Sequence, residues 1–295
     1  MLAIFGPTAS GKSAVAEAIA ERMPAEIVSA DAMQVYRGLP ILTNQPSVPT
    51  RLVAIWPLAH EASLGEYAPL AHGAIDGILA AGKTPIVVGG TGLYLRAALA
   101  DLALPPAPGP GARDRWSRLY DDEGATAAHA RLTELDPVAA SAVHPNDRRR
   151  VVRALELVEA GESLAPSEDR LWTGQTRHPT LIVGLDVPKD VLERRIEQRT
   201  ESMFDAGVQD EVRAALAGPI STTARKTLGL DEVATLSRNE AAAAIVVRTR
   251  RYAAYQRKWM RRIAGVVMVE ADRPPGEIAD DILTLARTRE RLPRR

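Results

Sequence analysis

The sequence predicts an α/β fold in which a helical insertion interrupts a core built on a parallel sheet. Short apolar runs alternate with longer stretches of helical periodicity, first over residues 1–104 and again over residues 179–295. This alternation is typical of parallel strands joined by right-handed crossover helices. The intervening residues 105–178 begin with a proline- and glycine-rich break and lack strand-like runs, so we expect them to form a separate helical domain.

The first expected strand, residues 1–5, runs into a glycine-rich loop and then into a helix that ends before Pro24. The loop fits the pattern G-x-x-x-x-G-K-[ST] and consists of Gly6, Pro7, Thr8, Ala9, Ser10, Gly11, Lys12 and Ser13. Its N–H groups and the helix N-terminus favour phosphate, Lys12 can neutralise a terminal phosphate, and Ser13 can hold Mg²⁺. An accidental glycine turn is the alternative, which the flanking strand and helix oppose. We therefore expect a P-loop NTPase-like core that binds a polyphosphate or pyrophosphate; the motif alone suggests ATP-binding.

A carboxylate follows the second expected strand, which we place at residues 26–30, and Asp31 comes directly after it. The carboxyl end of a parallel strand lies at the crevice where ligands bind α/β sheets. Asp31 should therefore open onto the same edge of the sheet as the phosphate loop. An ordinary turn or helix-cap aspartate is the alternative.

The remaining elements of the core follow from periodicity and turn residues. We expect strands at residues 52–55, 85–88 and 180–187, an edge strand at 266–269, and helices at 64–81, 190–204 and 241–263. The stretch Gly89-Gly90-Thr91-Gly92 closes one strand and suggests a second glycine turn on the ligand-binding edge. A plain strand-ending turn explains it equally well.

Two stretches are rich in basic residues. Within the insertion, Arg148, Arg149, Arg150 and Arg153 are candidates for phosphate contacts, although a solvated helix face paired with Glu156 and Glu159 is an equal alternative. The expected helix at 241–263 carries seven positive charges, and no acid occurs from residue 241 to residue 269. Such a helix, without a local counter-ion, favours a polyanionic partner over a plain solvated face.

Composition excludes several classes of protein. The chain has no cysteine, so disulfides and thiolate metal sites are impossible, and its histidines are scattered without the spacing of metal ligands. The formal net charge is zero, so nucleic-acid binding would depend on local patches. No apolar run approaches the ~20 residues of a membrane span, and the first strand leaves no room for a signal peptide. We expect a cytoplasmic protein with no membrane association, and a monomer.

Several motifs in combination resemble the tRNA dimethylallyltransferases, also called tRNA isopentenyltransferases. They occur in family order and span nearly the whole chain: the phosphate loop; Ser29-Ala30-Asp31 with Gln34-Val35-Tyr36-Arg37-Gly38; Gly89-Gly90-Thr91-Gly92-Leu93-Tyr94; His144-Pro145-Asn146-Asp147 with Arg150; Arg153-Ala154-Leu155-Glu156; and Thr249-Arg250-Arg251-Tyr252-Ala253 with Gln256 and Trp259. The phosphate loop alone is generic, whereas its combination with the His144–Asp147 segment is highly specific. The chain departs from the family pattern mainly in loops expected to face tRNA, at Ala32, Asn44, Thr50, Leu230 and Tyr255.

This resemblance implies a transferase that moves a dimethylallyl group from dimethylallyl diphosphate to N6 of the adenosine 3′ to the anticodon of tRNA. Residues 6–13 would then hold the donor's diphosphate rather than ATP, with Thr8 and Lys12 taking part in catalysis, Ser13 on Mg²⁺, and Asp31 as the general base. The insertion would grip the anticodon stem-loop. The residues expected along the tRNA are Asp31, Ala32, Met33, Gln34, Thr91, Arg113, Arg149, Arg150, Val151, Val152, Arg153, Lys226, Thr227, Leu228, Gly229, Leu230 and Asp231.

Three alternatives share part of this pattern. A small-molecule kinase would use the same loop and aspartate, but it needs neither the arginine-rich insertion nor the acid-free basic helix. A prenyltransferase acting on free adenine nucleotides would need no RNA-binding insertion. A non-catalytic RNA-binding protein would not depend on Asp31. The sequence leaves open the tRNA species and the range of prenyl donors.

Overall fold

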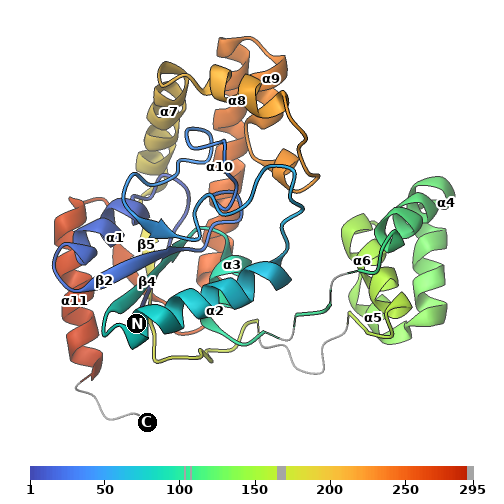
Figure 1. The fold of residues 1–295 in the computed structure, drawn as a ribbon, viewed down its shortest axis with the longest axis horizontal. Coiled ribbons are helices and arrows are strands. Elements are labelled where there is room, and N and C mark those ends of the chain that lie inside the picture. The colour runs from blue at the N-terminus through green and yellow to red at the C-terminus, as the bar shows by residue number, and fades with distance from the viewer. Residues whose placement is uncertain (103, 107, 165–170, 291–295) are drawn as a thin grey trace. The chain divides into compact units, whose positions relative to one another are not determined.

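The computed structural model describes residues 1–102, 104–106, 108–164 and 171–290 (Figure 1). The chain divides into two compact units, a core of residues 1–101 with 171–295 and a helical unit of residues 102–170. Within the expected insertion, residues 107 and 165–170 lie outside the described part.

The last eight residues of the expected insertion, 171–178, are part of the core unit. Three hydrogen bonds with α3 (Gly92–Leu99) explain this assignment. The buried Arg96 guanidinium donates to Leu171 O (2.9 Å) and to Gln175 O (3.1 Å), and Arg177 N–H donates to Leu99 O (2.8 Å). The boundary of the insertion is therefore earlier than the strand-like pattern alone suggested.

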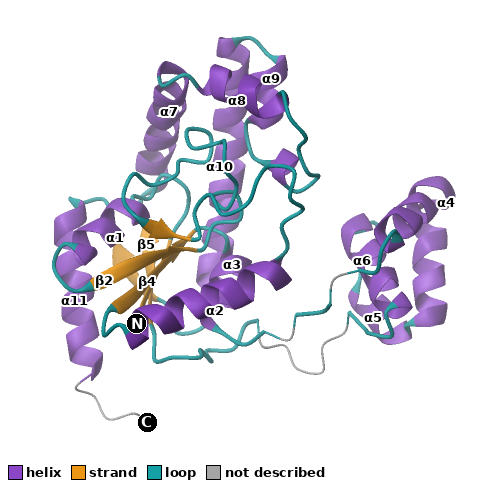
Figure 2. Cartoon of the chain, in the orientation of Figure 1, coloured by secondary structure: helices purple, strands orange, loops and turns teal. Residues whose placement is uncertain are grey.

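The core contains a six-stranded sheet of order β3-β2-β4-β1-β5-β6, in which every paired strand is parallel (Figure 2). Its strands are β1 (Leu2–Phe5), β2 (Ala25–Ser29), β3 (Thr50–Arg51), β4 (Thr84–Gly89), β5 (Leu181–Asp186) and β6 (Val267–Glu270). The expected α/β class is confirmed. Because β1 lies between β4 and β5, the loop that follows it emerges near the middle of the sheet's carboxyl edge.

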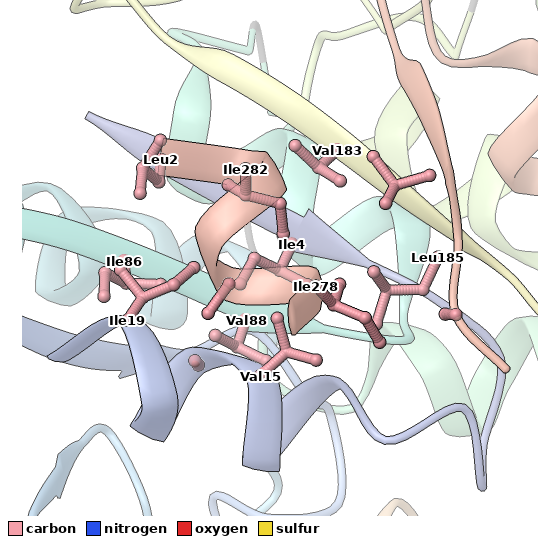
Figure 3. Close-up of a cluster of buried hydrophobic side chains, with 14 of the residues drawn as sticks. Leu2, Ile4, Val15, Ile19, Ile86, Val88, Val183, Leu185, Ile278 and Ile282 are labelled. Atoms are coloured by element: carbon pink, nitrogen blue, oxygen red, sulfur yellow. The ribbon is translucent and has the colours of Figure 1, made fainter. Parts of the chain in front are cut away.

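The strands bury both faces, as a parallel sheet requires. On one face Leu2 and Ile4 pack with residues of α1 (Lys12–Ala20) and α11 (Pro275–Glu290), as Figure 3 shows. On the other face Ala3 and Phe5 pack with residues of α2 (Leu64–Ala80) and α3. Alternate residues of one strand thus serve two separate apolar clusters, and this fixes the register of the strand.

A third apolar cluster joins the helices after β5 to the loop after β2. The helices are α7 (Lys189–Asp205), α8 (Val208–Leu216), α9 (Leu230–Thr235) and α10 (Arg238–Arg262), with a short 3₁₀ turn at Ala224–Lys226. Leu39 and Leu42 are buried in this cluster, and the Glu211 carboxylate accepts from Ile41 N–H (2.7 Å) and Leu42 N–H (2.8 Å). These contacts fix the long loop that begins at Asp31.

The helical unit consists of α4 (Ala112–Leu135), α5 (Pro137–Ala142) and α6 (Arg148–Glu159), with an apolar core of its own. Helix α4 extends over 24 residues, and Gly124 breaks its helical geometry with φ 86° and ψ 167°. Asp136 caps α5 by accepting from Ala139 N–H (2.9 Å), and Asp147 caps α6 by accepting from Arg150 N–H (3.1 Å).

One expected strand is wrong. The prediction at residues 52–55 rested on apolar character, but β3 ends at Arg51. Leu52 and Ala54 have φ of 65° and 54°, a left-handed conformation incompatible with continued pairing. The other expected core strands and helices are confirmed within a few residues at each end. None of the described helices is both long and apolar enough to cross a membrane.

Candidate active site

The phosphate loop connects β1 to α1 at the carboxyl edge of the sheet. Ala9 and Gly11 have positive φ (63° and 85°), and Ser10 N–H turns back to Pro7 O (3.2 Å). Among the described residues, the N–H groups of Ala9, Gly11 and Lys12 donate to no carbonyl. These unpaired donors and the start of α1 can together bind an anion.

Two cations lie against this loop, and neither forms an ion pair with a carboxylate in the described part of the chain. Lys12 Nζ donates to Pro7 O (3.2 Å), and Arg199 Nη1, from α7, donates to Thr8 Oγ1 (2.6 Å). Although part of Lys12 remains accessible, burial of its ammonium group lowers its pKa to about 8. Burial also lowers the pKa of Arg199, whose Nε is buried without a partner. Such desolvated cations favour an anionic ligand.

Asp31 follows β2 and lies close enough to Lys12 and Arg199 for its charge to affect the pKa of each. Its charge opposes the effect of burial on the pKa of Lys12 and of Arg199. Its Oδ1 also accepts from Met33 N–H (3.0 Å), which is the turn contact expected of an ordinary aspartate. The turn contact engages one carboxylate oxygen, so the structural role and a role as a base are compatible.

The second glycine turn closes the other side of this edge. A Cβ on Gly89 would lie 2.2 Å from Ala30 O, so only glycine allows β4 to approach the end of β2. Thr91 Oγ1 accepts from Ala32 N–H (3.4 Å) and lies 3.4 Å from the Tyr252 hydroxyl of α10. Burial and the charge of Asp31 raise the pKa of Tyr252 to about 12, so this phenol stays protonated. The turn is therefore part of the site and also a strand end.

Two residues of the site had no predicted role. Arg199 falls within the helix expected at residues 190–204, and Gln256 was noted only as part of a family-like motif. Gln256 is 2% exposed; its Oε1 accepts from Thr8 N–H (2.8 Å) and its Nε2 donates to Gly90 O (2.9 Å). Both residues are separated from the loop by more than 190 positions, so periodicity could not locate them. The motif containing Gln256 was the only available signal.

Two predicted tRNA-facing stretches, residues 31–34 and 226–231, meet within the core unit. The Thr227 hydroxyl donates to Met33 Sδ (3.3 Å), and Gln34 bridges Ser29 Oγ (2.8 Å) and Asn44 O (2.8 Å). In the second stretch, Lys226 and Asp231 are exposed and Leu228 is partly exposed, whereas Thr227, Gly229 and Leu230 are buried. These buried residues could contact RNA through backbone atoms, or affect binding by positioning the exposed residues beside them.

The arginines of the helical unit are mostly paired. Buried Glu156 accepts from Arg113 (2.8 Å) and Arg153 (3.0 Å), and Arg148 pairs with Asp121 (2.5 Å). The remaining predicted tRNA-facing residues divide by exposure: Arg149 and Arg150 are exposed, whereas Val151 and Val152 belong to the unit's interior. In the arginine cluster of residues 148–153, the alternative of a helix face paired with Glu156 is therefore correct for Arg153. Arg149 and Arg150 remain exposed and accessible to a partner.

The prediction that α10 lacks counter-ions is wrong. Arg248 pairs with Glu232, Arg250 with Glu197, and Arg257 with Asp186 (3.2 Å). The guanidinium of Arg262 lies 3.7 Å from the centroid of the Trp172 ring. The acids come from α9, α7 and β5, so they are near in space and distant in sequence. Arg251, Lys258 and Arg261 form no ion pair with a described carboxylate.

The residues around Ser13 fit a hard cation held mainly by oxygen. Ser13, Glu17, Ser29, Gln34 and Thr50 line one side of a small cavity with room for about one water molecule, and Ile27, Pro46 and Val88 complete its lining. No group of three or more His, Asp or Glu among the described residues could hold a metal alone. Mg²⁺ would therefore rely on the Ser13 hydroxyl, phosphate oxygens and water, which is the usual arrangement in phosphate sites.

Comparisons with known proteins identify the family of this chain. A family model described as IPP transferase matches residues 34–263, and one described as isopentenyl transferase matches residues 1–50. A tRNA dimethylallyltransferase of Corynebacterium jeikeium is 37% identical over 92% of each chain, and one of Nocardia farcinica is 39% identical over 88% of this chain and 87% of its own.

Solved structures give the same result. A tRNA isopentenylpyrophosphate transferase from Bacillus halodurans superposes with a TM-score of 0.69 at 30% identity, covering 98% of this chain and 97% of its own. A eukaryotic dimethylallyltransferase acting on tRNA has a TM-score of 0.80 at 24% identity over 97% of this chain and 79% of its own, and supports the fold. The chain belongs to the tRNA dimethylallyltransferase, or IPP transferase, family.

Proposed function

We propose that this protein transfers a dimethylallyl group from dimethylallyl diphosphate to N6 of the adenosine 3′ to the anticodon of tRNA, and releases diphosphate. The observation that carries this proposal is the combination of an anion cradle, two desolvated cations and Asp31 at one sheet edge. A chain that belongs to this family would use them on an allylic diphosphate.

In the reaction, the N6 amine attacks C1 of the dimethylallyl group while the bond between C1 and the diphosphate oxygen breaks. The bonding electrons leave with the diphosphate, where the loop N–H groups, Lys12 and Arg199 stabilise the developing negative charge. The Asp31 carboxylate accepts the proton released from N6. Because the allylic carbon becomes cationic, the amine must be held close and water kept away.

The remaining roles are also part of the proposal. Mg²⁺ beside Ser13 would neutralise charge on the diphosphate. The exposed Arg149 and Arg150 of the helical unit would contact phosphates of the anticodon stem-loop, and an unstacked adenosine would enter the core site. Because tRNA is the substrate, we expect the protein to act in the cytoplasm, and we expect a monomer.

The decisive experiment incubates the protein with radiolabelled dimethylallyl diphosphate and unmodified tRNA. We expect label in the RNA, and a dimethylallyl mass increase on the adenosine 3′ to the anticodon. Competition between AMP and an anticodon stem-loop identifies the true acceptor. Label that stays out of the RNA, with ATP hydrolysis or phosphoryl transfer in its place, would contradict the proposal in favour of a kinase.

A further inference from the structure

Gln256 is a buried polar side chain that joins the two glycine-rich loops of the site. It projects from α10, and its carboxamide lies between Thr8 of the phosphate loop and Gly90 of the second glycine turn. Both of its partners are backbone groups on loops that follow different strands, β1 and β4. The bridge therefore constrains the distance between the two loops.

The chemistry of this bridge requires a carboxamide. Thr8 offers an N–H donor and Gly90 offers a carbonyl acceptor, so one amide satisfies both and its orientation is fixed by its partners. A glutamate could accept from Thr8, but it would place a carboxylate oxygen against Gly90 O. A methionine of similar length could fill the space but would leave both buried groups unpaired.

The fit at Gly90 shows how closely this amide is packed. A Cβ at Gly90 would lie 2.3 Å from Gln256 Nε2 and 3.1 Å from Gly6 O. The second glycine turn therefore approaches both the amide and the start of the phosphate loop. An added methyl group there would have to displace the Gln256 side chain.

The contacts continue from Gln256 to groups assigned to the reaction. Thr8, held by Gln256 through its N–H, accepts from Arg199 through its hydroxyl. Next to Gly90, Thr91 accepts from Ala32 N–H, which adjoins Asp31. We propose that Gln256 is a positioning residue that holds the diphosphate cradle in register with the Asp31 loop, a role that rests on the proposed function.

The test measures inorganic pyrophosphate binding by calorimetry, alongside the kinetics of prenyl transfer. Gln256→Met should weaken pyrophosphate binding roughly tenfold and lower kcat/KM for dimethylallyl diphosphate roughly 10- to 100-fold, because misplacement of about 1 Å has effects of this size. Gln256→Glu should lose at least as much, because its buried carboxylate would face Gly90 O and add negative charge beside the diphosphate cradle. The control is Gln198→Met, the same change at an exposed site on α7, which should match the wild type.

A double substitution tests the packing between Gly90 and the amide. Gly90→Ala alone should impair pyrophosphate binding about as much as Gln256→Met. In a Gln256→Ala background, Gly90→Ala should reduce pyrophosphate affinity by a factor that is at least several-fold smaller. The reason is that Gln256 Nε2, the atom that the added methyl group would meet, is absent there. Losses that multiply independently would contradict the bridge.

The outcomes separate this proposal from the proposed function. Unchanged pyrophosphate affinity in Gln256→Met, or a loss matched by equal losses in melting temperature and tRNA affinity, would overturn the positioning role. A selective loss of pyrophosphate affinity and kcat/KM, with both of those retained, would support it. A wild-type protein that binds pyrophosphate but transfers no label to tRNA would contradict the function and leave the binding test valid.

Discussion

Lys12 and Arg199 of the core have desolvated charged groups and no carboxylate ion-pair partner in the described part of the chain, whereas Arg113 and Arg153 of the helical unit share buried Glu156. A buried cation without a counter-charge destabilises the ligand-free fold. A paired arginine stabilises its own unit and is less available to a ligand. The difference indicates that the core reserves positive charge for an anion, while the helical unit uses most of its arginines to hold its helices together.

The largest expected effect concerns Asp31, the acid that lies among the core cations. Asp31→Asn keeps an acceptor for Met33 N–H but loses the base, so turnover should fall about 10²- to 10⁴-fold with little change in tRNA affinity. Single-turnover kinetics and filter binding would measure the two quantities. A tRNA-binding loss as large as the rate loss would assign Asp31 to RNA binding instead.

Lys12→Met removes one of the two desolvated cations beside the phosphate loop. We expect about a 10²- to 10³-fold loss in kcat/KM, typical of a group that stabilises a developing oxyanion. The matched control in the helical unit is Arg131→Met, because Arg131 forms an exposed pair with Glu134. Its effect should stay within about twofold, since such pairs contribute little. Equal effects of the two substitutions would remove the distinction between the units.

Much of this organisation could be predicted from the sequence, because it depends on local patterns. The phosphate loop follows from its motif, and Asp31 was placed beside it because both follow parallel strands. The end of β3 could not be predicted, since the left-handed geometry of Leu52 and Ala54 leaves no mark in the residue types. The ion pairs of α10 were missed because Glu197, distant in sequence, lies beside Arg250.

The pairing in the helical unit predicts a loss of stability when its shared acid is neutralised. Glu156→Gln should destabilise that unit by about 2 kcal/mol, less than for a fully buried pair because Arg113 is half exposed. Hydrogen exchange in α4 and α6 would measure the change, with Glu134→Gln as the exposed control. Pyrophosphate affinity should not change. An unaltered exchange rate would show that the pairs contribute nothing to the unit.

In the ligand-free core, replacing Lys12 should raise the stability of the fold, whereas Glu156→Gln should lower that of the helical unit. Its pKa falls from 10.5 to about 8 on folding, so below pH 8 the charged form is present in both states and the folded state bears the desolvation penalty. Lys12→Met should therefore stabilise the free protein at pH 7 by about 1–3 kcal/mol. This advantage should fade as pH rises from about 8 to 10.5, where the unfolded chain also loses the proton. Urea titrations of both proteins would reveal it, and an advantage that is constant with pH would contradict the burial of the ammonium.

The smallest effect belongs to the exposed arginines that the helical unit leaves accessible. Arg150 is 66% exposed and only weakly associated with Asp147 (3.7 Å), so it remains available to phosphate. Arg150→Ala should weaken tRNA binding several-fold at low salt and reduce the salt slope of log K by about 1, because one phosphate contact releases about one counter-ion. Arg131→Ala, an exposed arginine of α4, should leave the slope unchanged. If Arg150→Ala also leaves it unchanged, Arg150 does not contact the RNA, and the helical unit must bind through other residues.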